Sequence, residues 1–561
     1  MKRKLPLFAS LAILCTMSLP ACQASSEEAA KSSTETVILN VYNSADYILE
    51  DETTTDENGK SVYTPGLVSQ FETYCKETYG VNVVVNYSTF DTNETMLSEL
   101  KTGKASYDLV CPSDYVVQKM IKEDMIEPFD EGSTPNYDKY VSRYVLDKIN
   151  SIEVNGKTNV VGNYIRGYMW GTLGILYNDN YFALKNRGIT AEEMDEDMKS
   201  WNSLWDNKYK NLLSIKDSVR DTYALGIFHT YDNDFVVDGK NYQGLSTLKD
   251  LHDNGTLDDT EYNQKVTEIF NLCDDTTLNR VGDELVKLKA NAFGFEVDSG
   301  KSDMVKGDKF AINLAWSGDA AYAMDLADEY NESGTIEGEE VEGDSKTANL
   351  KYVLPETGAN IWFDGWVMPK GANKLWASRF VDFLSKPENA AANMEYIGYT
   401  PVIAGDAILE KVQSWYDERY DEETEEMDYD SIDINSDDFS EEYFTKDIRY
   451  FFEGTLEEND IDEAGIFVLS LDSKGKQFDT QYPAKEELPH LAVMADFGEQ
   501  NASMLLMWES VKNTTLPTWA YVLILVCILL IIGIFVFLYI RKSAIRKRRK
   551  ERKLEREKKS A

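Results

Sequence analysis

A continuous apolar run near the C-terminus constrains this chain of 561 residues more than any other feature. Trp519–Ile540 holds 22 residues without a charge. At about 1.5 Å of rise per residue, a helix of this length matches a hydrocarbon core about 30 Å thick. The tail after it contains twelve Lys and Arg residues, which the positive-inside rule assigns to the cytoplasm. We therefore predict a transmembrane helix at 516–540, a basic cytoplasmic tail at 541–561 and a large ectodomain outside the cell.

The N-terminus carries a second membrane signal. Met1–Ala21 begins with charged residues and continues into an apolar stretch, as a secretory signal does. Its end, Leu19–Cys22 (LPAC), resembles a bacterial lipobox, which implies cleavage before Cys22, a lipid on its thiol and contact with membrane lipid; an ordinary signal with an incidental cysteine is the alternative. Residues 22–36 are rich in Ser, Ala and Glu and suit a flexible tether. The ectodomain is then held on the extracellular face of the cell membrane.

The charge of the chain excludes one class of partner. The formal net charge is −41, and fifteen of the basic residues lie at the two ends, so the middle carries about −53. Such a surface repels nucleic acid and attracts cations. We expect no nucleic-acid partner, although solubility alone would also explain the acidity.

Cysteine and histidine are too sparse for several kinds of chemistry. The ectodomain has Cys75, Cys111 and Cys273, at no metal-ligand spacing, so one disulfide is possible and its pair stays open. The three histidines of the chain form no cluster. Zinc chemistry and a Ser-His-Asp triad are therefore not expected. The chain also has no P-loop or dinucleotide glycine motif, and we expect no cofactor.

Alternating periodicities predict a mostly parallel sheet at the start of the ectodomain. The pattern runs strand, helix, strand, helix, strand over Thr36–Tyr42, Pro65–Tyr79, Val81–Tyr87, Asn93–Gly103 (with Asn93 as its cap) and Tyr107–Cys111. Open α/β sheets bind ligands at the loops that follow the strands. Here those loops are 43–47 and 112–115.

Six segments in order resemble the bacterial spermidine/putrescine-binding protein family. They are Tyr87–Asp130 (YSTFDTNETMLSELKTGKASYDLVCPSDYVVQKMIKEDMIEPFD), Tyr168–Asn178 (YMWGTLGILYN), Ser200–Gly226 (SWNSLWDNKYKNLLSIKDSVRDTYALG), Phe310–Ala323 (FAINLAWSGDAAYA), Asn360–Ala372 (NIWFDGWVMPKGA) and Tyr396–Val402 (YIGYTPV). The resemblance implies an α/β, two-lobed periplasmic-binding-protein-like fold of type II with a hinge. Lobe 1 would comprise 37–162 and 365–403, lobe 2 would comprise 163–364 and 491–512, and 404–490 would be an acidic insertion.

The same resemblance implies a polyamine ligand and the permease subunits of an ABC importer as partners. A polyamine needs separated carboxylates for its ammonium groups and aromatic walls for its methylenes. By residue-to-residue match, the implied ligand-binding residues are Asp46, Tyr47, Ser113, Tyr115, Ser218, Asp221, Trp316, Trp362, Asp364 and Tyr399. Among these, Asp364 is the expected central carboxylate and Asp221 the acid for one chain end.

Other interpretations of these residues remain open. Asp46 and Asp221 could cap helices, and the two tryptophans could be ordinary core. Ser44 stands where family members often carry a Trp, and Leu49–Tyr63 is an insertion beside the same loop. Asp417–Tyr443, with fourteen acidic residues, lacks EF-hand spacing, so we expect a solvated, partly disordered loop there.

Three functions from different classes follow from this sequence. The first is a transport receptor that binds polyamines or another small organic cation without covalent chemistry. The second is a ligand sensor acting through the membrane helix, but the tail is short for a signalling domain. The third is a hydrolase using a pair of carboxylates, for which the sequence fixes no spacing.

Overall fold

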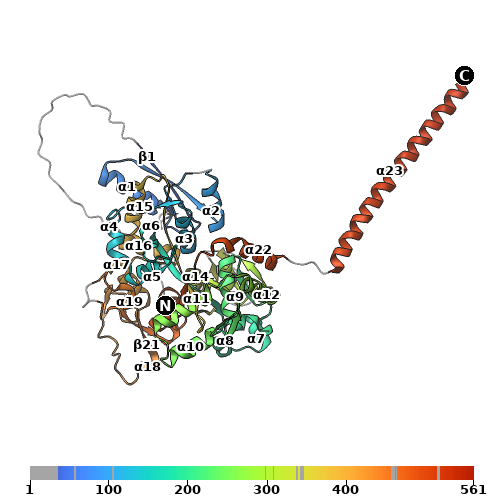
Figure 1. The fold of residues 1–561 in the computed structure, drawn as a ribbon. Helices are drawn as coiled ribbons and strands as arrows, with labels where there is room; N and C mark the ends of the chain where they lie inside the picture. The colour runs from blue at the N-terminus through green and yellow to red at the C-terminus, as the bar shows by residue number, and fades with distance from the viewer. Residues whose placement is uncertain are drawn as a thin grey trace, which may run out of the picture.

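The computed structural model describes residues 36–55, 59–103, 106–296, 299–307, 309–336, 339–340, 347–456, 461–462, 464–513 and 518–560. The signal segment, Cys22 and most of the tether lie outside the described residues. Figure 1 shows two lobes and a long C-terminal helix that extends away from them.

Lobe 1 is built on the parallel sheet that the sequence predicts. Strand β1 (Val37–Ser44) lies between β4 (Val83–Phe90) and β5 (Leu109–Val110), and both pairs are parallel. Helix α1 (Leu67–Tyr79) buries one face, Leu67, Phe71 and Cys75, as its spacing of four residues requires. The predicted strand–helix order of this lobe is confirmed.

The start of helix α2 (Asn93–Thr102) differs from the prediction. Its cap is Thr92, whose hydroxyl accepts the Thr95 N–H at 3.2 Å. The Asn93 side chain instead donates to the Ser113 hydroxyl at 2.9 Å and accepts the Ser113 N–H at 3.2 Å. The prediction of Asn93 as a cap was wrong: the neighbouring Thr92 caps the helix, and the Asn93 side-chain amide binds Ser113 in the loop after β5.

The other elements of lobe 1 are short. They are β2 (Glu52–Thr55), β3 (Ser61–Thr64), α3 (Asp114–Lys122), β6 (Ile126–Glu127), α4 (Pro135–Tyr140), α5 (Arg143–Ser151), α6 (Val161–Tyr164), β17 (Met368–Pro369), α15 (Lys374–Leu384), α16 (Pro387–Ile397) and β18 (Thr400–Pro401). The insertion at 49–63 contributes β2 and β3, which pair as an exposed antiparallel hairpin.

Lobe 2 is built on the larger sheet, in the order β11-β8-β12-β7-β16-β23. Strands β8 (Leu213–Lys216), β11 (Gly294–Glu296) and β12 (Ile312–Trp316) are mutually parallel, so their carboxyl ends meet at one edge. The remaining elements of this lobe are α7 (Phe182–Arg187), α8 (Ala191–Asp197), η1 (Trp201–Trp205), η2 (Asn207–Tyr209), α9 (Val219–Thr230), β9 (Phe235–Val237), β10 (Lys240–Tyr242), α10 (Leu245–Asp253), α11 (Asp259–Phe270), α12 (Asp275–Asn291), α13 (Gly300–Lys306), α14 (Ser317–Ser333), β13 (Thr335–Ile336), β14 (Glu339–Glu340) and β15 (Leu350–Val353).

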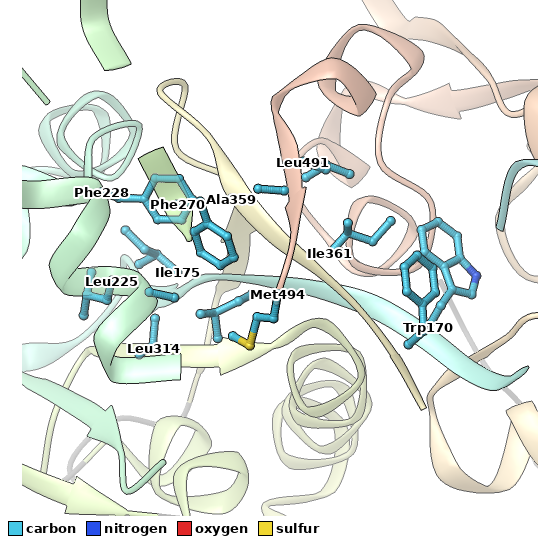
Figure 2. Packing of buried hydrophobic residues seen from close by; sticks show 14 of the residues in the cluster. Trp170, Ile175, Leu225, Phe228, Phe270, Leu314, Ala359, Ile361, Leu491 and Met494 are labelled. Atoms are coloured by element: carbon cyan, nitrogen blue, oxygen red, sulfur yellow. The ribbon is translucent and has the colours of Figure 1, made fainter. Parts of the chain in front are cut away.

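Two long strands connect the lobes. β7 (Arg166–Asn178) is buried along its whole length and pairs with β18 near its start and with β12 and β15 toward its end. Beside it, β16 (Ala359–Trp366) is antiparallel, and Val367 just beyond its end bridges to Val110 of lobe 1. Part of their buried side chains belongs to one large hydrophobic cluster with members in both lobes, which Figure 2 shows around Trp170, Ile361 and Leu314. Others, such as Met169 and Trp362, belong to a second cluster with the lobe 1 sheet. The proposed lobe boundaries at 162/163 and 364/365 stay a prediction.

The insertion at 404–490 is packed against this core. It contains α17 (Asp406–Tyr416), β19 (Tyr420–Asp421), β20 (Glu426–Met427), α18 (Phe439–Glu442), β21 (Tyr443–Asp447), α19 (Arg449–Phe452), β22 (Ile466–Ser470), η3 (Leu471–Ser473), α21 (Gln477–Gln481) and η4 (Lys485–His490). The Phe451 ring stacks on Trp170 with centroids 5.7 Å apart. Most of the acidic stretch at 417–443 is exposed, but Asp417 and Arg419 are buried as an ion pair at 2.8 Å.

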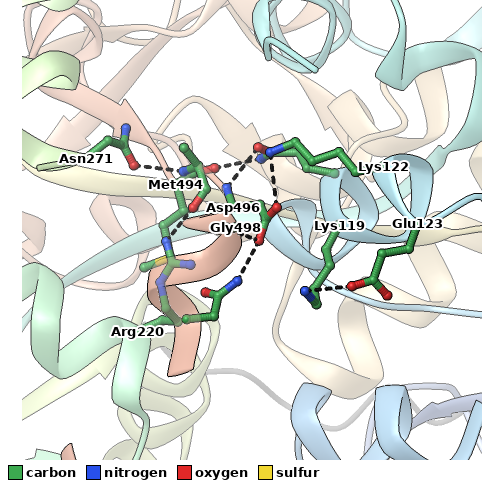
Figure 3. A network of polar contacts seen from close by, with 11 residues as sticks. Lys119, Lys122, Glu123, Arg220, Asn271, Met494, Asp496 and Gly498 are labelled. Carbon is green, nitrogen blue, oxygen red and sulfur yellow. Dashed lines mark hydrogen bonds and ion pairs between the residues drawn. The ribbon is translucent and has the colours of Figure 1, made fainter. Parts of the chain in front are cut away.

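Residues 491–500, which we name the strap, run between the two lobes and consist of β23 (Leu491–Val493), a short loop and η5 (Gly498–Gln500). Gln118 of lobe 1 donates to the Met494 carbonyl at 2.8 Å, and Lys122 pairs with Asp496 at 3.0 Å (Figure 3). From lobe 2, Asn271 accepts the Ala495 N–H at 2.8 Å.

After the strap, α22 (Asn501–Lys512) returns to lobe 2 and α23 (Thr518–Ser560) follows. The Trp508 ring of α22 packs on Phe295 with centroids 5.2 Å apart, and Lys289 donates to the Val511 carbonyl at 2.8 Å. Within α23, Ile528–Lys550 is long and apolar enough to cross a membrane by length and composition. The cysteines at 75, 111 and 273 are free, so among the described residues they form no disulfide.

Candidate functional site between the lobes

The centre of the candidate site is Asp364, near the end of β16. The register of β16 against β7 shifts between Asp364 and Gly365, and Ser113 of lobe 1 forms a β-bridge with Asp364. The shift lets the backbone leave the lobe 2 sheet for the lobe 1 sheet. A partly buried carboxyl group therefore stands at the point where the two lobes meet.

The Asp364 carboxyl is held by hydroxyl groups. Tyr47 donates its O–H to Oδ2 at 2.9 Å, and the Ser113 hydroxyl is a second partner. Burial raises the pKa of Asp364 to about 6; the two hydroxyl hydrogen bonds oppose this rise, and the charge of Asp221 adds to it. The group is thus ionised at neutral pH at a cost that a nearby cation would relieve.

A second carboxyl group, Asp114, lies behind the first. It is 1% exposed; its Oδ2 accepts the Phe363 N–H at 3.2 Å, and its Oδ1 has no hydrogen-bond partner among the described residues. Burial, and next the charge of Asp364, raise the pKa of Asp114 to about 8. The two groups titrate as a pair, and at neutral pH the proton resides mainly on Asp114.

Aromatic rings surround this pair. The Tyr399 ring lies edge-on to Tyr47 with centroids 5.1 Å apart and is tilted against Trp362 at 5.9 Å. The Trp362 indole N–H donates to the Thr172 carbonyl at 3.2 Å. A Cβ on Gly318 would come within 2.4 Å of the Tyr399 ring, so only glycine permits this wall.

The lobe 2 side of the site lies at the carboxyl ends of three parallel strands. Lys216 ends β8, Glu296 ends β11 and Trp316 ends β12. Asp319 follows in the first turn of α14, where the helix N-terminus favours a carboxylate.

Lys216 is a buried lysine on this side of the site. It is 1% exposed; its Nζ lies 2.8 Å from Asp319 Oδ2 and 3.3 Å from Glu296 Oε1, and 4.6 Å from the centroid of the Trp316 ring. Burial alone would lower the pKa of Lys216, but the charges of Asp319 and Glu296 outweigh it and raise that pKa. The same ion pair holds the pKa of Asp319 below its usual range despite burial, and Tyr399 donates to Asp319 at 2.8 Å.

Asp221 lies in the first turn of α9. Ser218 caps the helix by accepting the Asp221 N–H at 3.4 Å. Burial raises the pKa of the Asp221 carboxyl, partly offset by hydrogen bonds from Ser218 and from the Trp316 indole. The alternative of Asp221 as a cap was wrong, since Ser218 has that role.

Arg220 joins the two lobes through the strap. Its guanidinium lies 4.6 Å from the Tyr115 ring and 4.1 Å from the Phe497 ring, and it donates to the Ala495 carbonyl at 2.8 Å (Figure 3 shows this bond). The Tyr115 hydroxyl donates to Glu94 at 3.3 Å. Tyr115 therefore contacts the edge of the site rather than its centre.

The structure brings together most of the side chains that the sequence analysis proposed. Tyr47, Ser113, Trp362, Asp364 and Tyr399 form one group, and Ser218, Asp221 and Trp316 form the lobe 2 group. Two residues stand apart from these groups. Tyr115 lies at the edge of the site against Arg220, and Asp46 is exposed in a left-handed turn (φ 52°), where its charge acts on Tyr396.

Sequence reasoning missed the charged residues between these groups. Asp114, Lys216, Arg220, Glu296 and Asp319 all contribute to the site. Four of the five lie within segments already matched to the family. Their positions in the sequence could have identified them, because each lies at a strand end or in the first turn of a helix, where α/β proteins bind ligands. Among the described residues, no group of three or more His, Cys, Asp or Glu could hold a metal ion.

Comparison with known proteins assigns the chain to a family. The model of the bacterial extracellular solute-binding protein family matches residues 67–416, more than half of the chain. This chain belongs to that family. The match covers both lobes of the solute-binding protein and most of the site, and the predicted family and fold class are thereby confirmed.

Individual relatives agree with this assignment. A spermidine/putrescine-binding periplasmic protein of Salmonella typhimurium is 27% identical over 370 residues, which are 65% of this chain and 82% of the relative. A putrescine-binding periplasmic protein of Escherichia coli is 25% identical over 364 residues, 64% of this chain and 76% of the relative. A solved structure from Listeria monocytogenes, described as a candidate spermidine/putrescine ABC transporter, covers 85% of this chain and 98% of its own with a TM-score of 0.50 and 22% identity, which supports the two-lobed fold.

Proposed function

We propose that this solute-binding protein captures polyamines outside the cell and delivers them to the permease of an ABC importer. The observation that carries the proposal is the Asp364 carboxyl, which lies where the lobes meet, contacts hydroxyl groups and is ringed by Tyr47, Trp362 and Tyr399. The names of the relatives point to the same class of ligand.

The chemistry of the site suits a flexible chain with separated ammonium groups. One ammonium would donate hydrogen bonds to Asp364 and another to Asp221, while the aromatic rings cover the methylenes between them. A desolvated cation on an aromatic face contributes about 0.5–2 kcal/mol, and micromolar binding needs about 8 kcal/mol. Several contacts of this kind must therefore act together, which explains why acids and rings converge on one point.

Exchange of the ligand requires motion but no covalent step. Tyr399 of lobe 1 donates a hydrogen bond to Asp319 of lobe 2 at 2.8 Å, so we expect a ligand to enter between the lobes only when they separate. The long strands β7 and β16 and the strap are the connections about which such a hinge would bend. We propose that the protein is a binding component and has no catalytic activity of its own.

We further propose that both ends of the chain attach the ectodomain to the cell surface. Lipid on Cys22 would hold the N-terminus, and α23 would cross the membrane with its basic end inside. Two attachments would keep the receptor near its permease and raise its effective concentration there.

Calorimetry on the purified ectodomain tests the proposed ligand class. The titrants are putrescine, cadaverine, spermidine, spermine and choline. We expect at least one polyamine to bind with micromolar or tighter affinity, and Asp364→Asn to weaken it well over tenfold because a buried ammonium loses its charged partner. Asp250→Asn, an exposed acid on α10, is the matched control and should leave the affinity unchanged. Absence of binding by every amine at millimolar concentration would reject the proposal.

A further inference from the structure

Lys216 occupies an unusual position for a lysine in a site that is expected to bind cations. It lies at the carboxyl end of β8, between the ends of β11 and β12. This is the edge of the lobe 2 sheet at which open α/β sheets bind their ligands. The ammonium group is nevertheless 1% exposed, so it belongs to the interior of the site.

The surroundings of this ammonium are those that a ligand nitrogen would need. Two carboxylates, Asp319 at 2.8 Å and Glu296 at 3.3 Å, accept its charge, and the Trp316 ring lies 4.6 Å away. Carboxylates with an indole face are the combination that recognises an alkylammonium group. The protein's own side chain therefore fills the place of one ligand nitrogen.

The charges of the remaining acids decide how many ligand nitrogens can be matched. Asp319 and Glu296 are already neutralised by Lys216, and Lys301 lies 3.9 Å from Asp319. Asp114 lies behind Asp364, is 1% exposed and accepts the Phe363 N–H, so it does not face a ligand directly; in the ligand-free protein burial and Asp364 raise its pKa. Two carboxylates remain at the site, the partly buried Asp364 and the buried Asp221. The contacts described above give neither of them a hydrogen bond from a lysine, although the charges of Lys216 and Arg220 also act on Asp221 and lower its pKa.

From this arrangement we infer that Lys216 is a specificity-determining residue, an internal cation that restricts the site to ligands with two ammonium groups and disfavours those with three. The inference rests on the proposed function and narrows its ligand class from polyamines to diamines. A third ammonium would find no free carboxylate and would be repelled by the Lys216 charge in a poorly solvated site.

Two ligands of equal length but different charge test the inference in the wild-type protein, because any difference in their affinity then reflects the number of ammonium groups and not the length of the ligand. Spermidine and 1,8-diaminooctane have the same number of atoms between their terminal nitrogens, but only spermidine carries a third ammonium. We expect calorimetry to show 1,8-diaminooctane binding at least tenfold tighter than spermidine, and putrescine at least tenfold tighter than spermidine as well. Equal or tighter binding of spermidine would overturn the inference, and this comparison needs no variant to fold.

Substitution of the lysine then tests the residue itself. In Lys216→Met the preference for two charges over three should fall by tenfold or more, because Asp319 and Glu296 become available to a third ammonium. Lys216→Arg keeps the cation and should keep the preference. Lys309→Met removes a lysine paired with Asp303 on the same lobe, 2.7 Å apart, and serves as the control. Thermal unfolding confirms that each variant is folded before titration.

The outcomes distinguish this inference from the proposal on which it rests. Failure of the wild type to bind any amine rejects the proposed function. Binding of amines with the same preference in Lys216→Met as in the wild type leaves the proposed function intact and overturns the role of Lys216.

Discussion

The two sides of the site bury acids in opposite ways. Around Asp364 the contacts are hydroxyl groups and a second carboxyl, Asp114, and burial raises the pKa of both acids. Around Lys216 the acids meet a lysine, and the pKa of Asp319 is lowered although it is just as enclosed. The difference teaches that burial of an acid does not by itself identify a ligand-binding residue. An acid paired with an internal cation is already neutralised within the fold, whereas an acid without such a partner can bind a cation from a ligand.

Stability should respond to the two sides with opposite signs, and this is the largest effect that we expect. Lys216→Met leaves Asp319 and Glu296 buried without their cation and should lower the free energy of unfolding by about 3–5 kcal/mol. Asp364→Asn removes a charge that burial disfavours and should raise the stability of the ligand-free protein by about 1–2 kcal/mol. Urea unfolding of the ectodomain measures both. Destabilisation by Asp364→Asn would show that its carboxylate is already paired.

The affinity for a diamine should depend on pH through the Asp364 side. The folded-state pKa values of Asp364 and Asp114, about 6 and about 8, lie above their ordinary 3.8, so the contribution of these two groups to the stability of the ligand-free protein falls as the pH rises from about 4 to about 8. A bound ammonium favours the ionised carboxyls. Affinity should therefore rise about tenfold between pH 5.5 and 7.5. The hydrogen bonds to both carboxyls and the charge of Arg220, which lower the two pKa values, limit this rise.

Proton release on binding checks this prediction directly. Calorimetry at pH 7 in two buffers of different ionisation enthalpy should show a net release of protons in the wild type and a smaller release in Asp364→Asn. Identical heats in both buffers would contradict the shared titration of Asp364 and Asp114.

The smallest effect that we expect concerns Asp46. Sequence similarity proposes it as a ligand acid, but its side chain is exposed, apart from the Asp364 group. Asp46→Asn should change the affinity for putrescine less than twofold, as surface substitutions usually do. A tenfold loss would mean that the first loop folds over the ligand on closure.

Much of the fold was predictable because local signals agree with it. The parallel sheet of lobe 1 follows from strand and helix periodicity, and Asp364, Tyr47 and Ser113 were found by residue-to-residue match to the family although they are far apart in sequence. These predictions depend on patterns within short stretches of chain.

The remaining features depend on contacts that no short stretch contains. Lys216 looks like any lysine at a strand end, and only the approach of Glu296 and Asp319 from two other elements gives it a role. The sequence does not predict the strap, because its contacts are made by backbone carbonyls that Gln118 and Arg220 of different lobes reach.

The path of the chain after the strap determines which lobe can move. Helix α22 is fastened to lobe 2 through Trp508 and Lys289, and α23 begins only a few residues later. With α23 anchored in a bilayer as proposed, lobe 2 would stay fixed relative to the membrane and lobe 1 would move during hinge opening and closure. Closure on a ligand would then move lobe 1 and the strap relative to lobe 2, which stays fixed near the membrane. A neighbouring permease could therefore distinguish the occupied receptor by the position of lobe 1 alone.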